Sequence, residues 1–135
     1  MTSYGKNIKI EVFGGSHDSE IGITAENIPA GITFDMDKLR AFMQRRAPGQ
    51  SKLTTSRKES DTPVLMSGFD GSTTNGEKIR IVIRNENARS SDYSSLSSKP
   101  RPSHADYPAM VKSGGKADLR GGGHFSGRLT APICA

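Results

Sequence analysis

The sequence of 135 residues contains no tryptophan, a single cysteine and no long apolar run, and the last two features each exclude a class of protein. Cys134 alone cannot form an internal disulfide framework, which fits a reducing compartment. No apolar run approaches the ~20 residues that a membrane-spanning helix needs. Residues 1–13 also lack the apolar centre of a signal peptide. We therefore expect a cytoplasmic protein with no membrane partner.

Several familiar catalytic patterns are also missing from the sequence. His17, His104 and His124 form no HxH or HxxxH pair, and one cysteine cannot complete a zinc site. The GxSxG turn of many serine hydrolases does not occur. We therefore expect no metal and no hydrolase of that type.

Positive charge, by contrast, is concentrated in one stretch. The formal net charge is +5, and residues 38–58 contain seven bases and no acid. A solvated helix face would explain such a run, but the bases continue into a Pro-Gly turn and a strip rich in Ser and Thr. These donors favour an anionic ligand such as a phosphorylated metabolite. A basic module for polyanions stays open, although the interleaved aromatics typical of single-stranded nucleic acid binding are missing, and no nucleic acid is expected.

The spacing of apolar residues predicts an α+β fold. Residues 7–13 alternate as a half-buried strand does, and residues 21–25 repeat the pattern, so an antiparallel pair is expected. A helix of about 11 residues should follow its N-cap, Asp35, and end before Pro48. Further strands are predicted over 63–67 and 78–84, and a short helix over 104–112. Strands with interspersed helices indicate antiparallel sheets in one domain, 1–135, or the N-terminal part of a larger one.

Four loops have the composition of a ligand site. Three of them, Phe13–His17, Arg45–Ser51 and Arg101–Tyr107, place a histidine or paired bases beside Gly, Pro or Ser. Histidine can supply protons near neutral pH. The fourth, Arg120–Arg128, has consecutive glycines whose N–H groups could converge on an anion between two arginines. Loop capping stays the alternative for the histidines, and a flexible linker stays the alternative for the glycines.

Taken together, these segments resemble chorismate synthase, over nearly the whole chain and in the order of that family's N-terminal third. The matching segments are Phe13–His17, Ile28–Gly31, Gln44–Asp61, Ser67–Gly68, Ile83–Asn85, Ser91–Tyr93, Arg101–Tyr107 and Arg120–Gly123. So many collinear segments are far more specific than one motif.

The resemblance implies a fold, a reaction and roles for individual residues. It implies helices packed between antiparallel sheets, a homotetramer, and conversion of 5-enolpyruvylshikimate 3-phosphate to chorismate by 1,4-elimination of phosphate. Reduced FMN would be the cofactor, with NADPH a candidate reductant. By resemblance, His17 protonates the departing phosphate and His104 protonates reduced flavin. The substrate residues would be Ser16, Arg46, Lys52 and Arg128; the cofactor residues would be His124, Phe125 and Ser126, with Arg46 and Lys52 also matching an NADPH pair.

The chain departs from the family pattern at a few positions. Gly15 replaces a usual glutamate, while Asp18 and Ser103 each replace a usual glycine. The family's later part, which carries most FMN contacts and an aspartate thought to remove the ring proton, has no counterpart here. Residues 129–135 also look like a helix that stops early. A short, non-catalytic paralogue that binds an intact subunit therefore stays an alternative to an enzyme.

Overall fold

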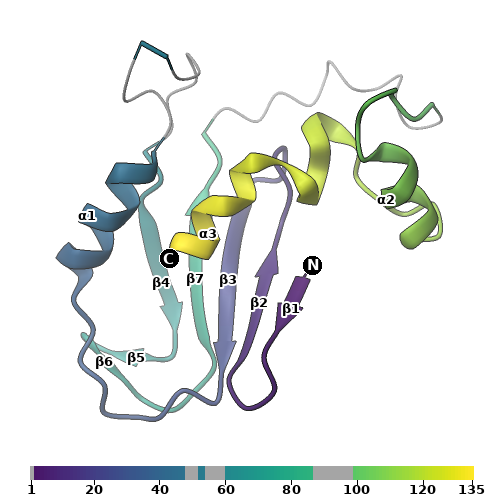
Figure 1. The fold of residues 1–135 in the computed structure, drawn as a ribbon. Helices are drawn as coiled ribbons and strands as arrows, with labels where there is room; N and C mark the ends of the chain where they lie inside the picture. Colours follow the sequence, from purple (N-terminus) through teal and green to yellow (C-terminus); the bar gives the residue numbers. More distant parts are fainter. Residues whose placement is uncertain (1, 48–51, 54–59, 87–98) are drawn as a thin grey trace.

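A five-stranded antiparallel sheet forms the centre of the molecule (Figure 1). The structure, a computed structural model, describes residues 2–47, 52–53, 60–86 and 99–135. The strand order is β1-β2-β3-β7-β4, with every neighbouring pair antiparallel. The strands are β1 (Thr2–Tyr4), β2 (Lys9–Phe13), β3 (Glu20–Glu26), β7 (Ile79–Arg84) and β4 (Pro63–Ser67).

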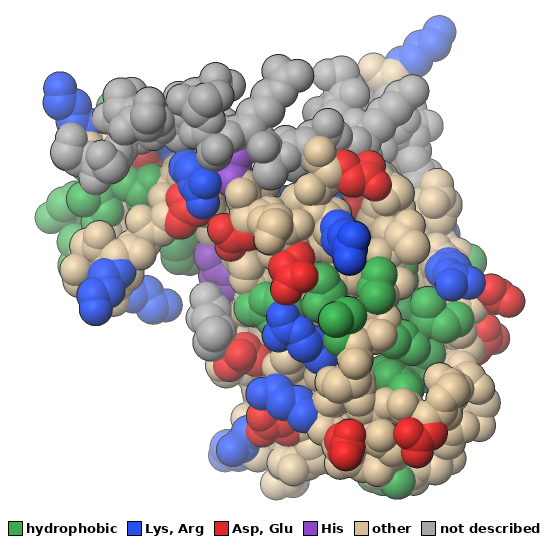
Figure 2. Space-filling view, turned by 180° about the vertical axis from the view of Figure 1, so that it is seen from behind, with side chains coloured by type: hydrophobic (Ala, Val, Ile, Leu, Met, Phe, Trp, Pro, Cys, Tyr) green, Lys and Arg blue, Asp and Glu red, His purple; other side chains and the backbone are tan. Residues whose placement is uncertain are grey.

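Alternation along the strands gives the sheet one apolar and one mixed face. On the apolar face Ile21 lies opposite Ile83, and both are almost fully buried. On the other face Arg80 pairs with Glu20 at 3.0 Å and lies over the ring of Phe13. Figure 2 shows this second face, where bases and acids surround a small apolar area. The period of two found in the sequence therefore decides which face receives the helices.

Two helices cover the apolar face. Helix α1 (Met36–Arg46) begins at Asp35, whose side chain accepts a hydrogen bond from the Lys38 N–H at 3.0 Å. Helix α3 (Thr130–Cys134) crosses the sheet beside α1 (Figure 1). The core between them and the sheet consists of Val12, Ile21, Leu39, Met43, Ile83, Leu129 and Ala131. Burying each large member of this set contributes about 1.5–3 kcal/mol.

The remaining helical elements lie beyond the end of the sheet where β2 stops (Figure 1). They are α2 (Asp106–Lys112) and two 3₁₀ segments, η2 (Arg120–Phe125) and η3 (Gly127–Leu129). In η2 the three consecutive glycines all have positive φ, so the segment doubles back over the loop that follows β2. No helix in the described ranges has the length and apolar character needed to cross a membrane.

The predicted α+β class, the antiparallel pairing of β2 with β3, and the helix capped by Asp35 are confirmed. The sequence did not reveal β1, which has only three residues, nor the hairpin of β5 (Phe69–Asp70) and β6 (Thr73–Thr74). The predicted start of α2 at 104 is two residues too early. Ser103, at φ 62°, turns the chain there, outside helical geometry.

Candidate active site

The loop carrying His17 lies directly beneath the glycine-rich segment η2. The Ser16 N–H donates to the Gly123 carbonyl at 3.1 Å. Gly121 lies against the imidazole so closely that a Cβ on it would be 2.3 Å from His17 Cε1. Only glycine fits that contact, and at φ 57° it also avoids the cost of a left-handed conformation. The sequence predicted the His17 loop and the glycine-rich segment as two separate candidate sites, and in the structure they pack against each other.

Ser16 and His17 are hydrogen-bonded to each other. The Ser16 hydroxyl lies 3.0 Å from His17 Nδ1 and donates to the Arg120 carbonyl, also at 3.0 Å. Ser16 is 2% exposed, so its hydroxyl faces protein and not an open cleft. Ser16 was predicted to contact the substrate. In the structure, the immediate partner of its hydroxyl is the backbone of η2.

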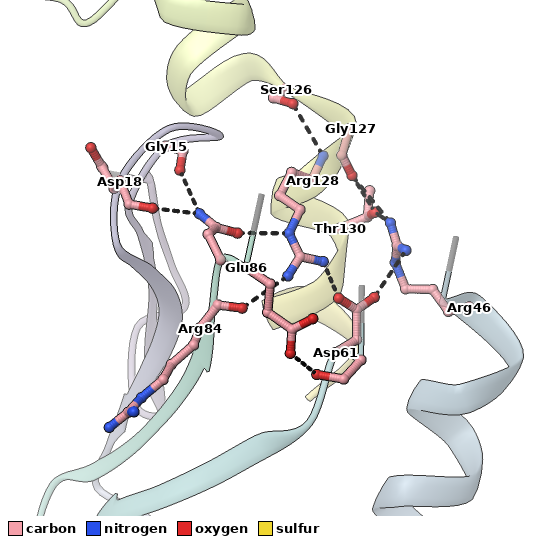
Figure 3. Close-up of polar contacts among 12 residues, drawn as sticks. Gly15, Asp18, Arg46, Asp61, Arg84, Glu86, Ser126, Gly127, Arg128 and Thr130 are labelled. Carbon is pink, nitrogen blue, oxygen red and sulfur yellow. Dashed lines mark hydrogen bonds and ion pairs between the residues drawn. The ribbon is translucent and has the colours of Figure 1, made fainter. Parts of the chain in front are cut away.

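Asn85 connects this loop to a buried arginine. Figure 3 shows its partners Gly15, Asp18 and Arg128. Its amide nitrogen donates to the carbonyls of Asp18 at 2.8 Å and Gly15 at 3.2 Å. Its amide oxygen accepts from Arg128 Nε at 2.8 Å. Because Asn85 follows β7 directly, the end of that strand holds both the His17 loop and Arg128 in place.

The same arginine belongs to an ion cluster centred on a buried aspartate. Asp61 is 1% exposed, is hydrogen-bonded to Arg128 Nη1, and has Arg46 Nη1 at 3.8 Å from its other oxygen. Arg46 also donates to the Gly127 carbonyl at 3.2 Å and to the Thr130 hydroxyl. We call Asp61, Arg46, Arg128 and Asn85 the Asp61 cluster. Two guanidinium groups against one carboxylate leave an excess positive charge, which favours a nearby anion.

The predicted substrate residues differ in accessibility. Arg128 is 7% exposed and directs its guanidinium into the Asp61 cluster. The side chain of Arg46 keeps a quarter of its surface open. Lys52 is exposed, in a described stretch of two residues, and within the described part of the chain no contact joins it to the cluster. Of the two predicted substrate arginines in the cluster, Arg46 is thus the one with more surface available to a ligand.

His104 is held in a separate turn before α2. It is exposed, and its Nδ1 donates to the Pro102 carbonyl at 2.9 Å. Beneath it Asp106 is buried and accepts from Arg101 Nε at 2.8 Å and Nη2 at 2.9 Å. These hydrogen bonds from the Arg101 guanidinium lower the pKa of the Asp106 carboxyl to about 2. In the residues that the structure describes, no contact joins His104 to His17.

A cleft of about 510 Å³ lies between β2, α2 and η2, within the usual size of a cofactor site. Its lining includes Phe13, Asp106, Lys112, Lys116, His124 and Phe125. His124 is held by two hydrogen bonds, from Nδ1 to the Gly14 carbonyl at 2.9 Å and between Nε2 and the Thr2 hydroxyl at 2.7 Å. Phe125 is 58% exposed. An open aromatic ring near two lysines fits a planar ligand that bears a phosphate.

The predicted cofactor segment thus divides into two kinds of residue. Phe125 offers an open ring to the cleft, which His124 also lines, while the side chains of His124 and Ser126 hold the backbone. The Ser126 hydroxyl accepts from the Arg128 N–H at 3.3 Å, capping η3. Part of a flavin site is therefore compatible with these residues, with His124 and Ser126 shaping the segment that presents Phe125.

Three bases of the stretch over 38–58 contact other side chains where the structure describes them. Arg40 pairs with Asp37 at 3.5 Å, Arg45 lies over the Phe42 ring, and Arg46 belongs to the Asp61 cluster. Of these contacts, only the Arg40–Asp37 pair cancels a charge, so the interpretation as a polyanion-binding face stays open. The Pro-Gly turn at 48–49, two further bases at 57 and 58, and the matching segment 91–93 lie outside the described residues. Within the described residues, no group of three His, Cys, Asp or Glu side chains is placed to hold a metal.

Comparisons with known proteins identify the family of the chain. The family model described as chorismate synthase matches residues 8–135. The chain belongs to the chorismate synthase family. A curated chorismate synthase from Chitinophaga pinensis is 45% identical over 135 residues, all of this chain and 40% of that protein. One from Thermococcus gammatolerans is 43% identical over 129 residues, 96% of this chain and 36% of that protein.

A crystal structure of a chorismate synthase has the same fold over the matched region. It is 21% identical, with a TM-score of 0.60 that covers 96% of this chain and 31% of the other. The chain thus spans about two fifths or less of the length of the relatives that it matches. The resemblance found in the sequence is confirmed for the family and for the fold class.

Sequence reasoning assigned no role to Asp61, Asn85 or Thr130, which the structure places around the predicted arginines. The first two lie inside segments that match the family, but nothing local shows their function. Asp61 and Arg128 are 67 residues apart in sequence and meet only through the packing of α3 and η3. A polar residue next to the end of a buried strand, as Asn85 is, was the available signal.

Proposed function

We propose that the protein is a chorismate synthase-type lyase, which converts 5-enolpyruvylshikimate 3-phosphate to chorismate and phosphate with reduced FMN. The observation that carries this proposal is the convergence of the His17 loop, the glycine-rich segment and the Asp61 cluster at one end of the sheet. Family membership supports the same reaction. The proposal includes a cytoplasmic, homotetrameric enzyme.

The reaction requires a proton donor and positive charge at one place. In a 1,4-elimination the C–O bond breaks with its electron pair on the phosphate, a base takes a ring proton, and a C=C bond forms. By resemblance, that base would be the aspartate in the family's later part. His17 donates a proton to the departing phosphate, while Arg46 and Lys52 attract its charge. Arg128 holds the cluster from within and adds its positive charge to the field at the site. Proton donation of this kind contributes typically about 10²–10⁴-fold in rate.

The cleft beside α2 is our candidate for the flavin. Phe125 would pack against the ring system, with His124 and Ser126 holding the segment, and His104 would keep a proton for the reduced ring. Reduced FMN, when bound, supplies transient electron density that returns to it, so the overall reaction is redox-neutral. NADPH is the proposed reductant, with Arg46 and Lys52 as its basic contacts.

A chimeric enzyme tests this function. The chain replaces the matched 40% of the Chitinophaga pinensis relative, so that the rest of that protein supplies the remaining part of the site. Chorismate formation from 5-enolpyruvylshikimate 3-phosphate is followed anaerobically with reduced FMN. We expect turnover, with a loss of about 10²-fold or more on His17→Ala.

The control is Ser67→Ala, a serine whose hydroxyl donates to the Lys78 carbonyl at 2.8 Å on β4, away from the site. That variant should turn over as the unmodified chimera does. A folded chimera that binds the substrate but forms no chorismate would contradict the proposed activity. It would instead favour a non-catalytic relative that pairs with an intact subunit.

A further inference from the structure

The hydroxyl of Ser16 lies between the Arg120 carbonyl and His17 Nδ1, and these two partners decide whether it donates or accepts in each hydrogen bond. A carbonyl oxygen can only accept, so the 3.0 Å bond to the Arg120 carbonyl requires the hydroxyl to donate its one proton there. The hydroxyl must then act as acceptor in its other bond, to His17 Nδ1 at 3.0 Å. The proton in that second bond belongs to His17.

We infer that Ser16 is a positioning residue that fixes the tautomer of His17, with the proton on Nδ1 and with Nε2 as the nitrogen that exchanges a proton. The bond that one ring nitrogen makes decides the state of the other. This inference rests on the proposed function only for the role of His17 in turnover. The assignment of the tautomer rests on hydrogen-bond geometry alone.

The Arg120 carbonyl, which accepts the hydrogen bond from Ser16, is fixed in its position. The Arg120 guanidinium is bound by Asp118 at 2.6 Å and lies 3.6 Å from Asp18, and the Arg120 N–H donates to Asp118 at 3.0 Å. The Arg120 bonds hold the pKa of the Asp118 carboxyl below its usual range. These contacts hold Arg120 in place, so that its carbonyl stays directed at the Ser16 hydroxyl.

The imidazole ring of His17 is held in place as well. Gly121 packs against the imidazole on one side, and Asn85 holds the backbone of the loop through the carbonyls of Gly15 and Asp18. Burial of Ser16 to 2% keeps water from competing for its hydroxyl. With both ends held, the Ser16 hydroxyl has one orientation that satisfies both neighbours.

Nitrogen NMR of the three histidines tests the inference directly on this chain. With ¹⁵N-labelled histidine, two-bond ¹H–¹⁵N spectra identify the protonated ring nitrogen once the imidazole is neutral, and the His17 signals are those lost in His17→Gln. We expect the Nδ1–H form for His17 in the unmodified chain. Ser16→Ala should shift it toward the Nε2–H form, and Ser16→Thr, which keeps a hydroxyl, should restore Nδ1–H.

Ser67→Ala removes a similar hydroxyl-to-carbonyl bond far from His17, and should leave the His17 spectrum unchanged. An Nε2–H tautomer in the unmodified chain would overturn the inference, and this result needs no variant to fold. So would a folded Ser16→Ala chain whose His17 spectrum equals that of the unmodified chain.

In the chimera, Ser16→Ala should lower kcat by about 10–100-fold, the range seen when a metal-bound histidine loses the partner that orients it, with little change in KM. A changed KM with unchanged kcat would contradict positioning through His17. If the tautomer is as expected but His17→Ala turns over normally, the proposed function of His17 fails and the role of Ser16 stands. If the tautomer differs while His17→Ala is inactive, only the inference about Ser16 fails.

Discussion

The two histidine loops are alike in sequence and are held in different ways. His17 is supported by Ser16, whose hydroxyl bonds to a carbonyl 104 residues away, and by Gly121. His104 is supported by the Pro102 carbonyl, two residues away. The geometry of His17 is therefore a product of the whole fold, whereas that of His104 is largely local. Changes far from His17 should disturb it, and few distant changes should disturb His104.

The largest effect is expected at Asp61. Asp61→Ala leaves the guanidinium of Arg128 buried without its carboxylate, a loss that typically costs about 3–5 kcal/mol of unfolding free energy. Urea unfolding measures it, and the His17 NMR signals should shift while those of His104 stay. Asp37→Ala, which removes an exposed pair with Arg40, is the matched control and should cost about 0–1 kcal/mol. Equal losses in the two variants would contradict the assigned importance of the cluster.

The next largest loss of stability is expected at Gly121, and a comparison of two variants tests its contact with His17. Gly121→Ala and Gly114→Ala both place alanine at a positive φ, 57° and 62°, at a cost of about 1–2 kcal/mol each. Only the first also drives a Cβ into His17, since nothing lies within 4 Å of a Cβ on Gly114. Gly121→Ala should therefore unfold at lower denaturant and move the His17 signals. Similar behaviour of the two variants would show that the imidazole does not rest on Gly121.

The next prediction concerns the His104 loop, where the buried Asp106 should make the stability of the fold depend on pH in the acid range. The pKa of Asp106 is about 2 in the fold, below the ordinary value for aspartate, so its contribution is complete above about pH 4. That contribution, on the order of 2 kcal/mol, is lost as pH falls through about 2. Asp106→Asn should reduce stability at pH 7 and flatten the pH dependence between 4 and 2. A variant with the same acid profile as the unmodified chain would contradict the Arg101 pairing.

The smallest expected effect is at Ser103. Its φ of 62° costs a non-glycine residue about 1–2 kcal/mol, partly offset by the lower chain entropy that serine keeps in the unfolded state. Ser103→Gly should raise the unfolding free energy by about 0.5 kcal/mol, measured by thermal denaturation, without moving the His17 signals. A loss of stability would show that the serine side chain supports the turn.

These contrasts also show what the sequence could predict. Strands β2, β3 and β7 and the cap at Asp35 follow from local spacing, and each was predicted. The resemblance to the family supplied the predicted site residues, whose roles stay predictions. Neither signal could show that Arg128 faces Asp61, or that Ser16 faces Arg120, because those contacts depend on how β3, β7 and α3 pack. Positions of hydrogen-bond partners far apart in sequence are fixed by tertiary structure.

The most direct test of the account is the release of phosphate in a single turnover by the chimera carrying His17→Ala. Because His17, oriented by Ser16, is the proposed donor to the departing phosphate, release should slow by about 10²–10⁴-fold while binding of 5-enolpyruvylshikimate 3-phosphate persists. Phosphate release at the rate of the unmodified chimera would contradict the account.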